Sequence, residues 1–582
     1  NLKGKVLIAN NKLTGNYTNF KPEFYTAGDF LESSVNKQVS SLEKRALQRD
    51  QNTLLLSLEY QWIRGKHNMQ FFGAHERLET IYKRDDGSVR EMSSNAPVFN
   101  FGDPNTLYLN SIANEFATAS YFGRFNYGYA GKYLLELNFR RDGSSRFAEG
   151  NKWGDFPSLS AAWRISDEHF MQNWDFLDLK LRGSWGRLGN QNIWTEYAFA
   201  DAMSGQEYYS FGNTIVPGRG TNLLANKAVR WETTEQLNVG MDLVLWNRFS
   251  LTADIFSKKT FDILARVTVP PSLGISTLPY QNVGTMINKG IELNVSYKAP
   301  ARKNKLNYGI SANATYLKNK LTNLGGLPFI DHSTHMRSVT GHPFSSFYGY
   351  KVERIYQVSD FTWQNNSNPV IPHQERTYVL KEGYPRQSSL MDKPAPGDIK
   401  LVDTDGNGEV TPDDRTLIGN PLPEFQYGFS IDLSYKQFAL NIIGQGVQGA
   451  DAYMNGHLIA PFFNTQGTIT KTVADNRWTF ENPSDNHTRI YVDKTRDALV
   501  TNYNIYDASY FRLKSVQLGY ELPDKLIQRY KVNRLRVFMN AENLLLFTPF
   551  IKGFDPERSY NNVTAAFHPQ ISSYTLGINL NF

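Results

Sequence analysis

Apolar and polar residues alternate along the last nine residues of the chain. Tyr574, Leu576, Ile578, Leu580 and Phe582 are apolar, and small or polar residues stand between them. Because successive side chains of a strand point to opposite faces, this pattern predicts a β-strand with one apolar and one polar face. A soluble sandwich and an outer-membrane barrel both contain such strands, so the rest of the chain has to decide between them.

The same alternation recurs from end to end. The clearest segments are 54–62, 125–129, 133–139, 159–163, 177–185, 237–245, 249–255, 291–297, 306–314, 425–435, 438–442, 516–522 and 535–539. Together with the terminal segment they indicate about sixteen strands. No helix-period domain, linker or low-complexity segment interrupts them, so the sequence predicts an all-β fold.

The connections between these segments are of two lengths. Short turns such as 246–248 and 436–437 alternate with long excursions near 82–118, 187–232, 317–423 and 445–508. Loops beyond about 15 residues are uncommon in compact domains, whereas outer-membrane barrels have short turns at one end and long loops at the other. We therefore predict one transmembrane antiparallel β-barrel domain over residues 1–582 with long extracellular loops, of which 317–423 is a long insertion.

Composition is compatible with this prediction. Hydrophobic residues make up 40% of the chain and the mean hydropathy is −0.47. The sequence has no apolar run long enough for a transmembrane helix, but alternation dilutes the signal of a barrel strand. The aromatic content of 14% suits either a rich core or aromatic girdles at the membrane interfaces. The absence of cysteine excludes disulfides and thiolate metal sites, and a net charge of +6 gives no case for nucleic acid.

The sequence shows no catalytic constellation. The G-x-S-x-G, H-E-x-x-H and Walker-type motifs are absent, so no enzyme is predicted. An outer-membrane hydrolase and a passive porin remain as alternative functions. In the excursion 187–232, Trp194, Tyr208, Tyr209 and Phe211 are aromatic side chains that could stack on sugar rings or peptide side chains of a ligand. The alternative is that they pack the loop against itself.

An acidic segment before the strand at 425 matches the twelve-residue calcium loop. The predicted ligands, at positions 1, 3, 5, 7, 9 and 12, are Asp403, Asp405, Asn407, Glu409, Thr411 and Asp414. Gly408 falls at the sixth position, where the loop turns sharply, and Glu409 would contribute its backbone carbonyl. Oxygen ligands without cysteine or histidine favour a calcium ion, here a structural clip. An ordinary acidic turn is the alternative.

Several blocks of sequence occur together and in one order. They are 120–127, 138–147, 156–164, 181–186, 189–191, 282–292, 397–400, 403–414, 418–421, 541–544 and 553–557, the second reading Asn-Phe-Arg-Arg-Asp-Gly-Ser-Ser-Arg-Phe. In these blocks the chain resembles the SusC/RagA family of TonB-dependent outer-membrane transporters of the Bacteroidota.

The resemblance implies a 22-stranded barrel with an N-terminal plug, in the outer membrane of a Gram-negative bacterium. It also implies active import of an oligosaccharide or peptide, energised by TonB-ExbB-ExbD and assisted by a SusD-like surface lipoprotein that acts as a lid. Transporter–lid pairs of the family often form dimers. This chain departs from the family pattern because it shows no plug-like segment, no TonB-contacting stretch and fewer strands. We expect it to be a C-terminal portion whose plug lies elsewhere.

Overall fold

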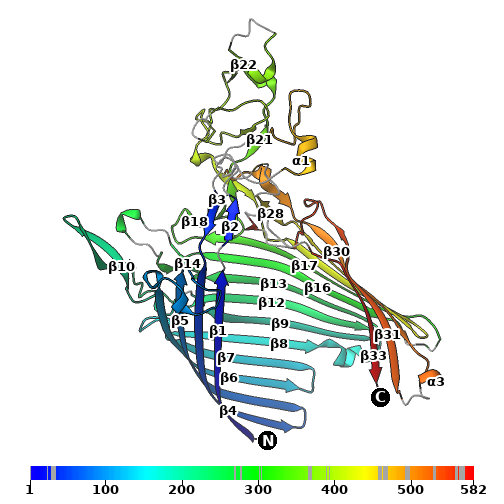
Figure 1. Cartoon of the computed structure of the whole chain (residues 1–582). Coiled ribbons are helices and arrows are strands. Elements are labelled where there is room, and N and C mark those ends of the chain that lie inside the picture. Colours follow the sequence, from blue (N-terminus) through cyan, green and yellow to red (C-terminus); the bar gives the residue numbers. More distant parts are fainter. Residues whose placement is uncertain are drawn as a thin grey trace. The chain divides into compact units, whose positions relative to one another are not determined.

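The computed structural model is built almost wholly of β-strands (Figure 1). It describes residues 2–581 except 22–23, 28–34, 194, 268–269, 275–277, 301, 303, 365–369, 388–389, 392, 456–461, 463–468, 492–498, 528–531, 558–560 and 563–569. Within these described residues, no helix is both long enough and apolar enough to cross a membrane.

The largest sheet among the described residues has sixteen strands in the order β1-β4-β5-β6-β7-β8-β9-β12-β13-β16-β17-β26-β27-β30-β31-β33. Their bounds are β1 Leu2–Lys21, β4 Ser41–Arg64, β5 His67–Arg90, β6 Tyr108–Tyr129, β7 Tyr133–Ser144, β8 Trp153–Arg164, β9 Leu177–Asn190, β12 Glu232–Leu245, β13 Phe249–Phe261, β16 Thr285–Lys298, β17 Asn307–Asn323, β26 Phe425–Tyr435, β27 Phe438–Gln448, β30 Tyr510–Glu521, β31 Arg534–Phe547 and β33 Ser573–Asn581. Every pair of neighbours with a described register is antiparallel.

The remaining elements lie in the connections. They are β2 Phe24–Ala27, β3 Val35–Gln38, β10 Ala202–Phe211, β11 Thr214–Leu223, β14 Leu264–Arg266, β15 Tyr280–Asn282, β18 Phe329–Ser333, β19 Met336–Val339, β20 Ser346–Gly349, β21 Val352–Ile355, β22 Phe361–Trp363, β23 Tyr378–Leu380, β24 Ile399–Leu401, β25 Thr416–Gly419, β28 Asp451–Met454, β29 Ile505–Asp507, β32 Asn561–Asn562, α1 Lys471–Asn476 and α3 Asp524–Ile527.

The chain divides into two compact units. The first contains residues 1–28, 33–291 and 321–330, and the second contains residues 29–32, 292–320 and 331–582. Strands β1 to β13 belong to the first unit, and β26 to β33 belong to the second.

The sheet of each unit has one apolar and one polar face, as the alternation predicts. In the first unit, Leu58, Phe139 and Val239 expose 56%, 51% and 60% of their surface. The second unit shows the same feature at Leu518 and Ile578, exposed by 48% and 67%. An apolar face of this extent on the outside of a protein marks contact with a membrane or another protein. We call this face outward and the polar face inward.

Fourteen predicted segments, the terminal one included, lie on strands of this sheet, and β1 and β5 are the two that the pattern missed. The prediction of one long excursion over 82–118 is wrong. Strand β5 continues to Arg90 and β6 begins at Tyr108, so only residues 91–107 connect them. The cause is a change in polarity along these strands: beyond the apolar stretch their outward residues become polar and the alternation is lost.

The short turns are tight and several use left-handed backbone. Strands β12 and β13 are joined through Trp246 and Asn247, whose φ angles are 52° and 54°. The backbone N–H of Trp246 donates to the carbonyl oxygen of Phe176, the residue directly before the neighbouring strand β9. The two rings stack with centroids 5.6 Å apart. A bulky residue in this conformation is unusual, and the stack helps to hold it there.

Candidate functional site

A row of polar side chains crosses seven strands of the first unit on its inward face. Its members are direct neighbours in register and are Gln61, Gln70, Asn126, Glu136, Ser160, Ser184 and Asn238. The Asn126 amide donates to Gln70 Oε1 at 3.2 Å, and the Gln70 amide donates to Glu59 Oε1 at 2.7 Å. We call these seven residues the polar row.

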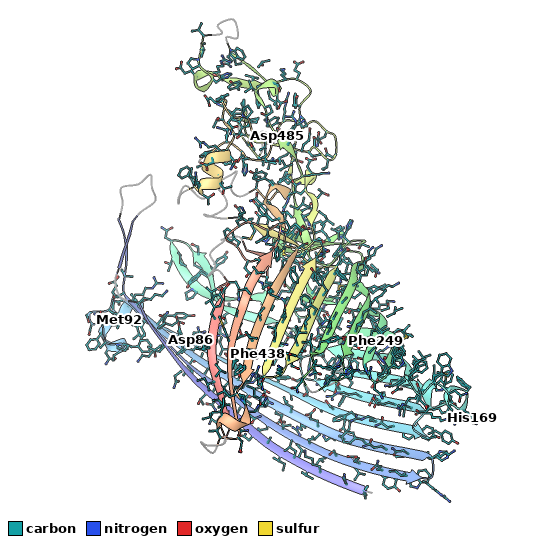
Figure 2. All side chains as sticks on the ribbon, turned by 90° about the vertical axis from the view of Figure 1, so that its right-hand side faces the viewer. Asp86, Met92, His169, Phe249, Phe438 and Asp485 are labelled. Carbon is teal, nitrogen blue, oxygen red and sulfur yellow. The ribbon has the colours of Figure 1, made fainter. Side chains whose placement is uncertain are left out.

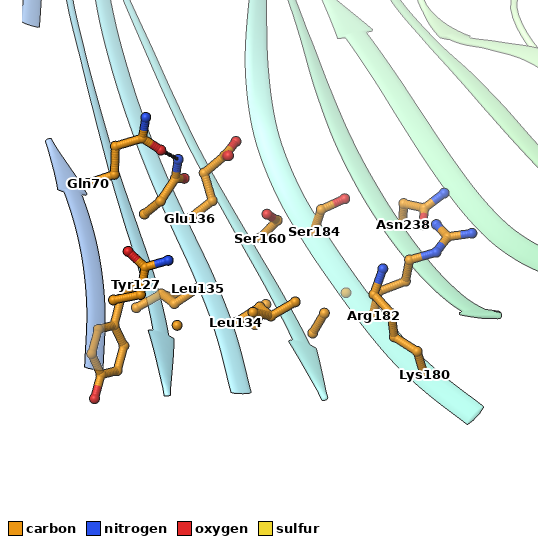
Figure 3. A pocket seen from close by; sticks show the side chains of 16 residues that line it. Gln70, Tyr127, Leu134, Leu135, Glu136, Ser160, Lys180, Arg182, Ser184 and Asn238 are labelled. Atoms are coloured by element: carbon orange, nitrogen blue, oxygen red, sulfur yellow. Dashed lines mark hydrogen bonds between the residues drawn. The ribbon is translucent and has the colours of Figure 1, made fainter. Parts of the chain in front are cut away.

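A pocket of about 440 Å³ lies along the polar row (Figure 3). Figure 3 shows Gln70 at one end of the pocket and Lys180 and Arg182 at the other, with Ser160 and Ser184 between them. Amide and hydroxyl groups both donate and accept hydrogen bonds. The wall can therefore hold a ligand, or a polypeptide segment, through hydroxyl or amide groups.

The cationic end of the pocket is neutralised by acidic partners. The guanidinium of Arg182 donates to both carboxylate oxygens of Asp254 at 2.6 Å, in a bidentate pair. Lys180 Nζ lies 3.5 Å from an oxygen of Asp242. Because these charges are paired, the pocket offers amide and hydroxyl groups and the carboxylate of Glu136 for hydrogen bonding, beside apolar Leu134 and Leu135.

Gly240 makes the Arg182–Asp254 pair possible. Arg182 is on β9 and Asp254 is on β13, so the ion pair passes over β12, where Gly240 stands opposite both residues. A β-carbon at this position would lie 2.5 Å from Asp254 Oδ1 and 2.8 Å from Arg182 Cζ. The alternation over 237–245 puts Gly240 on the polar face, but it does not reveal this bridge. A glycine on an inward position is the signal that could have suggested a side chain crossing above it.

The structure brings together the three aspartates of the predicted calcium loop. One carboxylate oxygen each from Asp403, Asp405 and Asp414 lies within 4.8 Å of the other two. Asp403 accepts the backbone N–H groups of Gly406 and Gly408 at 2.7 and 2.8 Å, which fixes the tight turn. This convergence is the geometry that the sequence pattern predicts for positions 1, 3 and 12.

The other three predicted ligands have varied surroundings. Asn407 donates its side-chain amide to Asp405 Oδ2 at 2.9 Å, so it lies beside the aspartates. Thr411 instead accepts from the N–H of Asp413 and caps a short 3-10 helix at Pro412–Asp414. Glu409 forms a parallel bridge with Arg386 through its backbone.

Asp414 is the buried anchor of this loop. Its side chain accepts from the backbone N–H groups of Thr404 and Thr411 at 2.6 and 2.7 Å, and none of its surface is exposed. Burial acts to raise the pKa of the Asp414 carboxyl, but the N–H donors of Thr411 and Thr404 outweigh burial and lower the pKa. Asp414 is therefore ionised at neutral pH.

The predicted ligand-stacking residues lie on an exposed hairpin. Tyr208, Tyr209 and Phe211 belong to β10, which pairs with β11, and they expose 68%, 67% and 67% of their surface. The rings of Tyr209 and Phe211 contact each other, with centroids 4.9 Å apart. Trp194 lies outside the described residues. These three aromatic side chains thus form an exposed patch on one hairpin and do not line the pocket of the polar row.

Comparison with known proteins decides the family. The model of the family described as "TonB dependent receptor-like, beta-barrel" matches residues 4–544. The chain belongs to this TonB-dependent receptor β-barrel family. Its members are outer-membrane proteins of Gram-negative bacteria, and the apolar outward face is the surface that such a barrel turns to lipid.

Curated TonB-dependent receptors are similar over most of this chain. TonB-dependent receptor P3 of Formosa agariphila is 29% identical over 97% of this chain and 58% of its own length. TonB-dependent receptor P26 of the same organism is 34% identical over 82% of this chain and 48% of its own length. TonB-dependent receptor SusC of Bacteroides thetaiotaomicron is 28% identical over 81% of this chain and 44% of its own length. The chain thus spans about half the length of these receptors.

A solved structure confirms the fold of this TonB-dependent receptor barrel. A chain of the structure described as the RagAB peptide transporter superposes with a TM-score of 0.75 at 24% identity. The match covers 100% of this chain and 59% of the other. The predicted all-β transmembrane barrel and the resemblance to the SusC/RagA group are both confirmed.

Proposed function

We propose that this receptor barrel imports a polar nutrient actively across the outer membrane, driven by TonB-ExbB-ExbD and assisted by a SusD-like lipoprotein lid. The polar row is the single observation that carries the proposal, since it lines the inward wall with amide and hydroxyl groups and the carboxylate of Glu136. The similarity to SusC and to the RagAB structure supports it. A passive porin needs neither plug nor lid, and a hydrolase needs convergent catalytic groups; neither alternative has a specific observation in its favour.

The proposed ligand is an oligosaccharide or a peptide. Sugar hydroxyls and peptide amides both find partners in amide and hydroxyl side chains, so the polar row suits either class. We further propose that Tyr208, Tyr209 and Phe211 contact this ligand as it enters. Replacing all three with Ser is expected to raise the ligand concentration at half-maximal uptake severalfold, because the aromatic rings can no longer stack on the ligand. The barrel is expected to remain folded. An unchanged uptake curve would remove them from the ligand path.

The test of function uses the full-length transporter in its native membrane. Co-purification is expected to recover a surface lipoprotein and a trapped oligosaccharide or peptide, identified by mass spectrometry. Uptake of that compound is expected to stop when TonB is removed. Uptake that continues at the same rate without TonB would contradict active import and support the alternative of a passive porin. We also propose dimers of transporter–lid pairs, and a mass of one pair in mild detergent would exclude them.

We propose that the loop around Asp403 holds a structural calcium ion. Three carboxylates this close repel one another, and a divalent cation removes that repulsion. Asp403 is half-buried and Asp405 is exposed, so their carboxylate oxygens are accessible to an ion. The buried Asp414 fixes the backbone of the loop by accepting from the N–H groups of Thr404 and Thr411. When bound, the ion would stiffen the end of the long connection before β26.

The calcium proposal predicts a specific loss of loop order. Asp403→Ala with Asp405→Ala is expected to abolish the protection of this loop from proteolysis that millimolar calcium gives to the wild type. Asp413→Ala is the matched control, because Asp413 is an exposed acidic neighbour outside the cluster. Equal proteolysis of the wild type with calcium and with chelator would contradict the proposal.

A further inference from the structure

The acidic turn, by which we mean residues 403–414, lies on the extracellular side of the second unit. It belongs to the long connection between β17 and β26, which the ion pair of Asp398 with Arg489 joins to the connection after β27. Figure 2 shows Asp485 of that second connection at the opposite end of the strands from Phe438, which follows a short turn. Outer-membrane barrels carry their long loops outside the cell, so water and dissolved cations reach the acidic turn.

The acidic turn contains an asparagine followed by a glycine. Asn407 precedes Gly408, and both residues are exposed. In such a pair the backbone nitrogen of the glycine can attack the side-chain amide carbon of the asparagine and close a five-membered ring. Glycine favours this attack because it has no β-carbon beside the attacking nitrogen. The groups that contact the reacting atoms decide whether the folded turn assists the reaction.

The attacking nitrogen is hydrogen-bonded to a carboxylate. The backbone N–H of Gly408 donates to Asp403 Oδ2 at 2.8 Å. Ring closure requires this nitrogen to lose its proton, and a carboxylate that already contacts the proton can accept it as a general base. Asp403 is therefore placed to act on the nucleophile of the reaction.

The side-chain carbonyl of Asn407 has a donor of its own. The backbone N–H of Glu409 donates to Asn407 Oδ1 at 2.8 Å. When the glycine nitrogen adds to the amide carbon, negative charge develops on this oxygen. A backbone N–H that already points at the oxygen stabilises the charge without further reorganisation. The turn thus supplies both a base for the nucleophile and a donor for the developing oxyanion.

Asp405 restricts the movement of the Asn407 side chain. Its carboxylate accepts from Asn407 Nδ2 at 2.9 Å and from the backbone N–H of Asn407 at 3.0 Å. A side chain that is held before the reaction loses less conformational freedom when the ring closes. The folded turn therefore favours ring closure over the same dipeptide in a flexible chain.

We propose that Asn407 deamidates itself through Gly408, with Asp403 as the general base and the Glu409 N–H as the oxyanion donor. The Gly408 nitrogen forms a bond to the Asn407 amide carbon and gives its proton to Asp403. The bond from that carbon to Nδ2 then breaks, and Nδ2 leaves as ammonia with the proton returned by Asp403. Water opens the resulting succinimide and leaves aspartate or isoaspartate at position 407.

Either product alters the cation site proposed for the acidic turn. Aspartate adds a carboxylate beside the three aspartates of the cluster, whereas isoaspartate lengthens the main chain by one carbon. The longer main chain changes the spacing on which a twelve-residue calcium loop depends. This consequence rests on the proposed calcium ion, but the reaction itself does not. An ion bound by Asp403 would withdraw that carboxylate from the Gly408 N–H, so bound calcium is expected to slow the reaction.

The test measures deamidation in the full-length transporter, purified in detergent and aged with a chelator. Peptide mass spectrometry follows it, because exchange of NH₂ for OH changes the mass of the peptide that contains position 407. Asp403→Asn keeps the size of the side chain but removes the base, so conversion is expected to slow by at least about tenfold. If Asp403 only restrained Gly408, its loss would free the turn. An equal or faster rate in Asp403→Asn would therefore overturn the proposal.

Two controls accompany this comparison. Asp413→Asn changes an exposed acidic neighbour outside the cluster, and it is expected to convert at the wild-type rate. Asn-Gly also occurs at 455–456, where Asn455 is 3% exposed, so both pairs age in the same molecule. Conversion at position 407 is expected to be faster than at position 455. Equal conversion at the two positions would show that the dipeptide alone sets the rate, and it would overturn the assistance by the turn.

Ageing in millimolar calcium separates this inference from the proposed ion. Calcium is expected to slow conversion in the wild type, since Asp403 then binds the ion. Equal rates with calcium and with chelator would contradict the calcium site and leave the self-deamidation in place. An Asn407 that stays intact in chelator would overturn the self-deamidation and leave the calcium site in place.

Discussion

At the residue scale, a missing side chain determines how the inward wall is held together. Gly240 leaves room for Arg182 to cross β12 and reach Asp254, where the two groups form a bidentate ion pair. Such a charge-assisted pair is stronger than a neutral hydrogen bond and joins strands that are not neighbours. The glycine therefore contributes to the rigidity of three strands, although it makes no side-chain contact.

Gly240→Ala tests this role directly. The new β-carbon would overlap Asp254 and Arg182, so we expect the pair to open and the free energy of unfolding to fall by about 1–2 kcal/mol. Thermal unfolding in detergent measures the change. Gly183→Ala on β9 is the control, because its nearest atom, the Asn238 carbonyl oxygen, lies at 3.9 Å. Equal melting of the two variants would show that the pair tolerates displacement.

At the element scale, one carboxylate ties the insertion between β17 and β26 together. Asp360 accepts from Arg354 at 2.6 and 2.7 Å and from the Tyr384 hydroxyl at 2.9 Å, which joins β21 to residues further along the insertion. Burial acts to raise the pKa of Asp360, but the Arg354 guanidinium and the Gln357 N–H outweigh it and lower the pKa to about 2.

This shift predicts an acid-sensitive insertion. A carboxyl whose pKa is lowered on folding stabilises the fold above its unfolded pKa and loses that contribution as pH falls through the folded value. We expect on the order of 2 kcal/mol to be lost between about pH 4 and about pH 2. Pepsin cleavage of the insertion over this range measures it. Asp360→Asn should cleave readily already at pH 4, and a variant as resistant as the wild type would refute the assignment.

The elements also show what the sequence could predict. Strand β4 was found from Leu54 to Trp62 because every outward residue there is apolar, and the same holds for 237–245 of β12 and 574–580 of β33. Strand β5 was missed because Gly73 and His75 occupy outward positions, and its outer half because Tyr82 is out of phase with Phe71. The Arg182–Asp254 bridge depends on the register of three strands, which local alternation does not contain. The acidic loop was predictable because its spacing is local.

At the scale of the whole molecule, the bilayer is the solvent that the outward face is built for. Val239 is outward and 60% exposed, whereas Asn238 beside it belongs to the inward polar row. Val239→Arg is expected to cost about 2–4 kcal/mol near the midplane, because a charge there must leave water. Asn238→Arg should be tolerated. The two variants are compared by the fraction of folded, heat-modifiable barrel in outer-membrane preparations. Equal fractions for Val239→Arg and Asn238→Arg would place position 239 away from lipid.

The change from apolar to polar outward residues along strand β4 also sets the depth of the protein in the membrane. Sinking by two residues along β4 would carry Asn52 into hydrocarbon, and rising by two would expose Leu54 to water. Both displacements are unfavourable, so the level at which this strand leaves the bilayer is fixed. Where the surrounding bilayer is thicker than the apolar band, the lipid beside β1, β4, β5 and β6 must thin to match it, because the strands cannot slide.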